Sequence, residues 1–289
     1  MIFDKINEGK SDFTKVYNNC TPSLYFQTMQ GSGYSIPESS AEMTMYLLEL
    51  LSFKQEENFN ILDIGCSYGV NSSVLKYGMR LDELYELYAI TGNRGEIITR
   101  DKRLYTERDA QSNLNFFGFD SADEAVKYAI ESRAISDGWS ADYEHSDSNV
   151  GVDQIPIKAL GSIDVILSTG CVGYITERTF NTILPFMGNS LPLMTISYVL
   201  RMFDYSNIAK ALKQHGYNTA RLPNQQFHQR RCTGREEHDF SLSQLRARGL
   251  HPTRSEVEGI LCADLYVSWR DEVPEQALKW VKGLQQLLA

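Results

Sequence analysis

The chain has 289 residues, enough to bury a sizeable core in one large domain or two small ones. Hydrophobic residues make up 42% and charged residues 22%, as in ordinary globular proteins, and no apolar run is long enough to predict a membrane span. The formal net charge of −9 argues against a nucleic-acid partner, because phosphate backbones attract clustered Lys and Arg.

The cysteines are scattered along the chain, and none forms a C-x-x-C pair. The sequence therefore predicts neither a metal site nor a disulfide framework. The N-terminal residues MIFDKINEGKSDF lack the basic start and the apolar stretch of a secretory signal. These features together favour a cytoplasmic protein with no membrane partner.

Apolar periodicity predicts helices and strands that alternate along the chain. The first helix is expected to begin at a capping box from Ser39 to Glu42 and to end near Phe53, before a strand at residues 60–64. A second capping box, from Ser121 to Glu124, predicts the start of another helix. Further strands are expected at residues 115–120, 138–143, 163–168, 193–200, 254–257 and 264–269. Further helices are expected at residues 177–184, 206–215, 242–248 and 275–288. This alternation is typical of a doubly wound α/β sheet, in which ligands bind at the carboxyl ends of the strands.

The stretch ILDIGCSYG, at residues 61–69, has the pattern of a buried strand that enters a glycine turn. A dinucleotide site of the G-x-G-x-x-G type needs a third glycine where this chain has Val70. Asp63, two residues before the first glycine, would repel a pyrophosphate and suits a cofactor that carries an ammonium group. Asp120, at the end of the second strand, can accept hydrogen bonds from the two hydroxyls of a ribose.

Four segments in this order resemble the class I S-adenosylmethionine-dependent methyltransferases of the small-molecule type. They are ILDIGCSYG, FFGFD, DGWSADYE and SIDVILSTGCVGY, and the resemblance covers roughly residues 55–270. It implies an α/β fold, a doubly wound Rossmann-like class I methyltransferase sheet of seven strands whose last strand is antiparallel. It also implies an N-terminal helical cover at residues 1–54 and a methyltransferase domain at residues 55–289.

The resemblance implies S-adenosylmethionine as the cofactor. Asp63 would lie near the cofactor's amine, and the glycine turn would approach the methionine part through its backbone. Ser67 stands where the family usually has glycine, which a small side chain allows. The complete set of cofactor residues that the resemblance implies is Asp63, Gly65, Cys66, Ser67, Gly69, Asp120, Ser121, Ala141, Asp142, Ser168, Thr169 and Tyr34.

One departure from the family is the distance between the two acids. Asp63 and Asp120 are 57 residues apart, where about 20 are usual. The excess, near residues 77–114, is expected to form a lid, a dimer contact or a solvated excursion. A homodimer is therefore one of the outcomes that the sequence leaves open.

The acceptor side is expected to contain His228, Arg201, Arg231 and Tyr174. An alcohol acceptor usually needs a base, whereas a carboxylate is already ionised at neutral pH and can be held by arginine. The competing interpretations are an ion pair with Asp204 or another acid for Arg201 and a surface position for His228. We expect methyl transfer to an oxygen of a small molecule, a carboxylate ahead of a hydroxyl, in natural-product biosynthesis. The alternatives are N-methylation, NAD-dependent oxidoreduction and a catalytically silent cofactor-binding protein.

Overall fold

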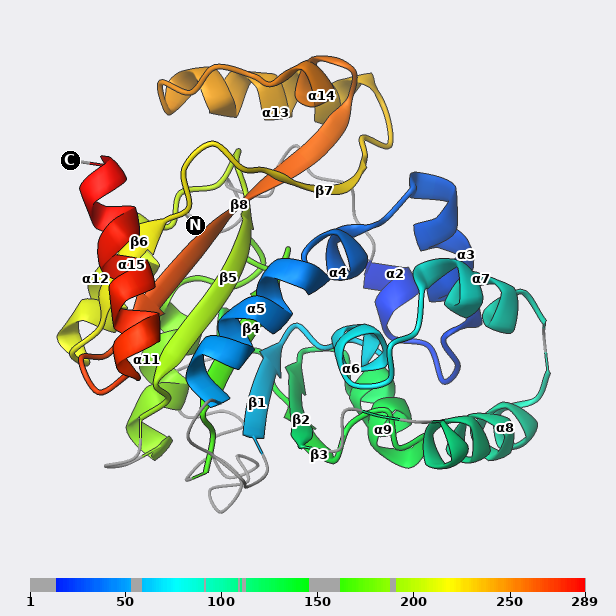
Figure 1. Cartoon of the computed structure of the whole chain (residues 1–289). Coiled ribbons are helices and arrows are strands. Elements are labelled where there is room, and N and C mark those ends of the chain that lie inside the picture. Colours follow the sequence, from blue (N-terminus) through cyan, green and yellow to red (C-terminus); the bar gives the residue numbers. More distant parts are fainter. Residues whose placement is uncertain are drawn as a thin grey trace.

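The computed structural model describes residues 14–52, 59–90, 92–108, 110, 113–145, 162–187 and 191–288. Its strands form one twisted sheet (Figure 1). The strands are β1 (Phe59–Ile64), β2 (Leu114–Asp120), β3 (Asp137–Ser140), β4 (Val165–Thr169), β5 (Met194–Leu200), β6 (Asn218–Arg221), β7 (Phe227–Arg231) and β8 (Ile260–Trp269). The domain boundary expected near residue 54 falls at residues 53–58, outside the described residues.

The sheet has the order β3-β2-β1-β4-β5-β8-β6. Strands β1 to β5 run parallel, and β8 pairs antiparallel with both β5 and β6. The predicted doubly wound Rossmann-like sheet with an antiparallel last strand is therefore confirmed. Strand β7 lies off this seven-strand path and pairs with β8 as an eighth strand. Because β1 lies between β2 and β4, the order reverses there, and a ligand crevice is expected at the carboxyl end of β1.

Helices lie on both faces of the sheet. Those before β2 are α2 (Thr14–Tyr17), α3 (Ser23–Ser32), α4 (Ile36–Ser39), α5 (Ala41–Ser52), α6 (Val70–Leu75), α7 (Leu81–Ala89) and α8 (Arg94–Glu107). Those after β2 are α9 (Asp123–Glu131), α11 (Glu177–Ile183), the 3-10 turn η2 (Leu184–Met187), α12 (Ser206–Gln214), α13 (Arg235–Ala247), α14 (Arg254–Val257) and α15 (Glu275–Leu288). In Figure 1, α13 and α14 lie at the top of the view, beyond β7 and β8. No helix in the described ranges is both long enough and apolar enough to cross a membrane.

Alternate side chains of β1 supply the two faces of the core. Phe59 and Ile61 join a buried cluster that includes apolar residues of α5 and α15. Leu62 and Ile64 join a second cluster that includes residues of α11 and α12. All four side chains are almost fully buried, and burial of each such side chain contributes about 1.5–3 kcal/mol. The glycine turn therefore follows a strand that is packed on both of its faces.

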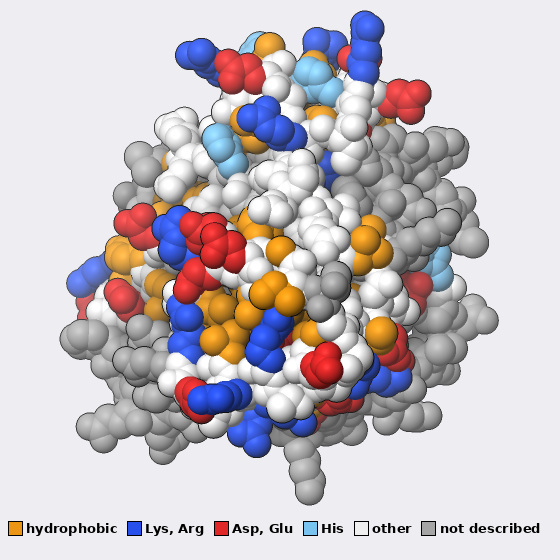
Figure 2. Space-filling model, turned by 90° about the vertical axis from the view of Figure 1, so that its right-hand side faces the viewer, with side chains coloured by type: hydrophobic (Ala, Val, Ile, Leu, Met, Phe, Trp, Pro, Cys, Tyr) orange, Lys and Arg blue, Asp and Glu red, His pale blue; other side chains and the backbone are white. Residues whose placement is uncertain are grey.

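In the described part of residues 77–114, helices α7 and α8 contribute side chains to a third buried cluster. Leu84 and Tyr88 of α7 are buried, and the Tyr88 ring stacks on Phe26 of α3 at a centroid distance of 4.5 Å. The outer side of this region carries acidic and basic side chains interspersed with apolar ones (Figure 2). Helix α7 thus packs against α3 and helix α8 against α9, so these two helices are not a solvated excursion.

The strand predicted at residues 254–257 is wrong, because these residues form helix α14. Its N-cap is a capping box, in which the Thr253 side chain accepts a hydrogen bond from the Glu256 amide and Glu256 accepts one from the Thr253 amide. The sequence TRSE, at residues 253–256, matches a capping box, but the short apolar pattern of this region favoured a strand. Strands β6 and β7 were not predicted, and α13 begins at Arg235, seven residues before the expected start at residue 242.

Neither predicted capping box forms. Ser39 is the last residue of α4, and its hydroxyl donates to the carbonyl oxygen of His228 at 2.8 Å. Helix α9 has Ala122 at its N-cap and no side-chain cap, because the preceding Asp120 bonds the Ala122 amide instead. At Ser39 a tertiary hydrogen bond replaces the predicted capping box, and at the start of α9 a hydrogen bond from the Ala122 amide to Asp120 does so.

Candidate ligand-binding site

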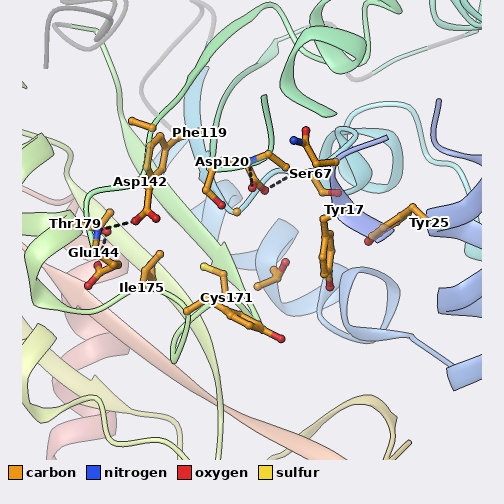
Figure 3. Close-up of a pocket in the computed structure, with 18 of the residues that line it drawn as sticks. Tyr17, Tyr25, Ser67, Phe119, Asp120, Asp142, Glu144, Cys171, Ile175 and Thr179 are labelled. Carbon is orange, nitrogen blue, oxygen red and sulfur yellow. Dashed lines mark hydrogen bonds between the residues drawn. The ribbon is translucent and has the colours of Figure 1, made fainter. Parts of the chain in front are cut away.

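A cavity of about 470 Å³ lies at the carboxyl ends of β1 to β4. Figure 3 shows Tyr17 and Tyr25 at one side of it, Glu144 and Thr179 at the other, and Asp120 with Ser67 between them. The volume lies in the range of small-molecule sites. The cavity thus coincides with the crevice that the strand order predicts.

The turn after β1 forms the inner wall of this cavity. Gly65 and Ser67 line it, and both have positive φ angles, 80° and 48°. A Cβ on Gly65 would lie 2.7 Å from the Cβ of Cys171, so this position excludes larger residues. Ser67 occupies a left-handed backbone position, a requirement that a small side chain alone does not meet. Gly69 lies outside the lining, and its absent side chain makes room for Ala134, 2.8 Å from a Cβ placed there.

Asp120 ends β2 and points into the cavity. One carboxylate oxygen accepts the Ser67 amide at 2.8 Å, and the other accepts the Ala122 amide at 3.0 Å. Burial raises the pKa of Asp120, and the backbone hydrogen bonds oppose that rise. Each carboxylate oxygen has a second lone pair, so Asp120 can hold the turn and still accept hydroxyl donors from a ligand.

Asp63 lies behind this wall and does not line the cavity. It is fully buried; one oxygen accepts the Asn71 side-chain amide at 2.9 Å, and the other has no hydrogen-bond partner within the described residues. Asn71 also donates to the hydroxyl of Thr169, which does line the cavity. Burial raises the pKa of Asp63 to about 7, the Asn71 hydrogen bond opposes this, and Asp120 adds to it. A cationic group nearby would stabilise the ionised form.

The loop after β3 contributes an aromatic and polar end of the cavity. The rings of Phe119 and Tyr143 stack at 5.2 Å. Glu144 accepts hydrogen bonds from the Thr176 amide and from the Thr179 hydroxyl, which fixes this loop to the start of α11. The predicted residues Ala141 and Asp142 line this end, as does Ser121 of the β2 loop.

Four tyrosines line the opposite end: Tyr17, Tyr25 and Tyr34 from the N-terminal segment, and Tyr174 from the loop after β4. Burial raises the pKa of the first three, so their hydroxyls stay protonated and can donate hydrogen bonds at neutral pH. For Tyr17, burial is the dominant effect on the pKa, and Arg230 opposes only part of the rise. The end of the cavity under the N-terminal helices is therefore rich in neutral donors.

Strand β7 supplies two further side chains through a β-bulge. His228 pairs with Cys262 and Arg230 with Leu261 of β8, which leaves Gln229 as the extra residue. The bulge breaks the in–out alternation, so Gln229 and Arg230 are both buried and line the cavity, while His228 and Arg231 are exposed. Hydrogen bonds to Ser35 and Ser39 hold the carbonyls of His228 and Gln229.

Arg230 is held by a buried ion pair. Its two terminal nitrogens donate to the two Glu237 oxygens at 2.8 and 2.6 Å, and both side chains are almost fully buried. Glu237 also accepts the amide of Thr233 at 2.9 Å. The pair fixes the guanidinium at the cavity wall and cancels its net charge there.

Three of the four residues expected on the acceptor side lie away from the cavity. Arg201 is buried in ion pairs with Glu256 and Asp264, so the competing interpretation of an ion pair is the observed one, with other acids than Asp204. The ring of exposed His228 contacts the hydroxyl of Ser255 at 3.1 Å, and Arg231 is exposed. Of the expected cofactor residues, Cys66 and Ser168 are buried outside the lining.

Sequence reasoning missed several lining residues. Tyr143 and Glu144 belong to the segment DGWSADYE, whose motif position offered a signal. Tyr17 and Asn18 lie within the expected cover at residues 1–54, but no motif there indicates that they line a site. The run Gln229-Arg230-Arg231 was a candidate carboxylate anchor, but Arg231 was chosen from it, and the bulge brings Gln229 and Arg230 inward instead. In the described part of the chain, no group of three or more His, Cys, Asp or Glu side chains is arranged to hold a metal ion.

A scan against protein-family models and a search of curated proteins gave no significant match. Solved structures similar to this chain include magnesium protoporphyrin IX methyltransferase (ChlM) from Synechocystis PCC 6803 with bound SAM, at 10% identity, covering 93% of this chain and 91% of that one, with a TM-score of 0.40. Another is the N-methyltransferase NodS from Bradyrhizobium japonicum WM9 with S-adenosyl-L-homocysteine, at 12% identity, 90% and 97% coverage and a TM-score of 0.39. A third is the plantazolicin methyltransferase BpumL with SAH, at 13% identity, 93% and 95% coverage and a TM-score of 0.38.

Proposed function

We propose that this protein transfers a methyl group from S-adenosylmethionine to an oxygen of a small molecule, a carboxylate ahead of a hydroxyl. The observation that carries the proposal is the cavity at the switch point, where the turn Gly65–Ser67 and the Asp120 carboxylate meet. This cavity belongs to a sheet whose antiparallel strand β8 lies between β5 and β6. When bound, S-adenosylmethionine supplies a methyl group on a positively charged sulfur.

The residues on the cofactor side suit the parts of that molecule. Asp120 can accept the ribose hydroxyls while it holds the Ser67 amide, and Phe119 with Tyr143 offers apolar ring surface for an adenine. Asp63, close behind the wall, has a buried oxygen with no partner among the described residues, a group that an ammonium ion would stabilise directly or through water. A pyrophosphate fits less well, because α6 has only six residues and Val70 fills the place of the third glycine.

The residues on the acceptor side support a carboxylate. Tyr17, Tyr25 and Tyr34 are protonated donors, and Arg230 rather than Arg201 or Arg231 brings a guanidinium to the wall. An ionised carboxylate needs no base. Among the described residues that line this end, no imidazole is present to deprotonate an alcohol. The chain would act mainly by aligning acceptor and methyl group in a site with few waters.

A nitrogen acceptor is the second candidate. Gln229 has a buried carbonyl oxygen without a partner within the described residues, and an amine N–H could donate to it. An amine that is neutral at the working pH also needs no base.

Two experiments test the proposal. Calorimetric titration with S-adenosylhomocysteine should show binding, while NADH should show none; the reverse result would assign the site to a dinucleotide. Incubation with methyl-labelled S-adenosylmethionine and a panel of small acids, phenols and amines should then label an acid. A methyl ester releases labelled methanol in alkali, whereas a methyl ether or a methylamine keeps its label. Alkali-stable label would overturn the carboxylate assignment.

A further inference from the structure

The position of Gln229 has a consequence for the acceptor that this site takes. Its side chain is 7% exposed and lines the cavity, and its carbonyl oxygen is buried without a hydrogen-bond partner in the described part of the chain. A buried carbonyl left unpaired costs about 1–3 kcal/mol. An unpaired carbonyl oxygen on a side chain that lines a ligand cavity indicates that the ligand supplies the hydrogen-bond donor.

Three features of the fold hold the Gln229 amide in place. The bulge in β7 turns the side chain inward, and the backbone carbonyl of Gln229 accepts the Ser35 amide at 2.7 Å. Gly170, in the loop after β4, has a φ of 71°, and a Cβ there would lie 2.5 Å from the Gln229 side-chain nitrogen. The amide is thus pressed against the β4 loop, and its direction is fixed before any ligand arrives.

The side chains around the Gln229 amide indicate the other chemical features of the ligand. Next to Gln229 along β7 lies Arg230, whose guanidinium lines the cavity and is fixed by Glu237. The same end of the cavity contains the rings of Tyr17, Tyr25 and Tyr34, of which Tyr17 and Tyr25 are 5.5 Å apart. Aromatic walls favour a planar, unsaturated ligand.

We infer that Gln229 determines acceptor specificity by accepting a hydrogen bond from an O–H or N–H group of a small aromatic acid. The acceptor is therefore a hydroxy- or amino-substituted aromatic carboxylic acid. Its carboxylate faces the tyrosine and Arg230 donors, and its second polar group faces Gln229. This inference rests on the proposed function, because it takes the tyrosine end of the cavity as the acceptor side.

The test uses the full-length protein saturated with S-adenosylhomocysteine, and hydroxybenzoates and aminobenzoates with the substituent at each ring position. The matching methylbenzoates have similar shape but no donor. Calorimetry should show that at least one hydroxy or amino acid binds about tenfold or more tightly than its methyl counterpart, because the latter leaves the Gln229 oxygen unpaired.

In Gln229→Leu this difference should disappear, while the affinity for S-adenosylhomocysteine stays unchanged. Gln229→Met serves as a second variant in case the leucine perturbs folding, which circular dichroism monitors. Gln226→Leu is the matched control, because Gln226 is exposed immediately before β7. It should retain the discrimination.

The outcomes distinguish a failure of the proposed function from a failure of the inference about Gln229. If S-adenosylhomocysteine does not bind, the proposed function fails. If S-adenosylhomocysteine binds but the hydroxy and amino acids bind no more tightly than the methylbenzoates, a water satisfies Gln229 and the inference is overturned. The inference is also overturned if none of these acids binds. Discrimination that survives in both Gln229 variants would equally overturn it.

Discussion

The end of the cavity at β1, β2 and β3 is built from short stretches in which the strand and its own loop supply the lining, such as Phe119, Asp120 and Ser121. The tyrosine end is built from the N-terminal helices, the β4 loop and an eighth strand, segments up to about 200 residues apart in the sequence. The first end is fixed by local geometry and the second by tertiary contacts. Substitutions should therefore separate them: changes at the β2 end alter cofactor binding, and changes at β7 alter stability and acceptor choice.

The strongest separation should come from Arg230→Met. This change leaves Glu237 as a buried, uncompensated charge, a loss of on the order of 3–5 kcal/mol. Thermal unfolding followed by circular dichroism should show a Tm lower by roughly 10 °C. The double variant Arg230→Met/Glu237→Leu should recover most of the loss. If the single variant unfolds like the wild type, the ion pair does not hold the tyrosine end together.

At the other end, Asp120→Ala should weaken S-adenosylhomocysteine binding by about 100-fold, because it removes both the acceptor of the Ser67 amide and the partner for the ribose. Calorimetry measures the affinity. Asp123→Ala is the control, since Asp123 is an exposed acid three residues later that pairs with Lys127. Equal losses in the two variants would show that general charge, and not the position of Asp120, attracts the ligand.

The pH dependence of binding tests the role of Asp63. Its pKa of about 7 means that lowering the pH from 8 to 6 protonates most of the carboxylate and should weaken S-adenosylhomocysteine binding about tenfold. In Asp63→Asn, binding should be weak at both pH values and lack this slope. A slope that persists in the variant would have to come from another group at the cavity.

The same group affects the ligand-free protein in the opposite direction. The Asp63 pKa is raised from 3.8 in an unfolded chain to about 7, so its contribution to stability is complete below about pH 4 and is lost as the pH rises through 7. The full loss is on the order of 4 kcal/mol. The Tm of the wild type without ligand should therefore fall between pH 5 and pH 8 by more than that of Asp63→Asn.

The smallest effect is expected from Ser35→Ala/Ser39→Ala, which removes two hydroxyl hydrogen bonds to the His228 carbonyl. Each contributes about 0.5–1.5 kcal/mol, so the Tm should fall by a few degrees. S-adenosylhomocysteine affinity should not change, because neither serine lines the cavity. A change in that affinity would mean that the two ends are coupled.

The sequence predicted the parts of the fold and site that depend on local patterns. The strands β1, β2, β4 and β5 were found as apolar runs, and Gly65, Ser67 and Asp120 line the cavity as their motif positions suggest. Asp63 was expected near the cofactor's amine; it does not line the cavity itself, and Asn71 connects it to Thr169, which does.

The tyrosine end could not be predicted in the same way. An alternating strand over residues 227–231 would put His228 and Arg230 on one face and Gln229 and Arg231 on the other. Gln229, the unpaired residue in the pairing of β7 with β8, changes this alternation, and no residue type in FHQRR predicts the bulge. Arg201 ends a strand at the correct edge, yet Glu256 and Asp264 from distant segments engage it.

The bulge at Gln229 also affects how this protein can diverge. Deleting Gln229 or Arg230 from β7 would restore regular alternation and remove one of the two side chains that face the cavity, while the pairing with β8 could continue on either side. Such a change leaves the ends of β1, β2 and β3 untouched. Acceptor preference in a lineage of this fold could therefore shift in one step by the loss or gain of one codon, with methyl-donor binding inherited intact.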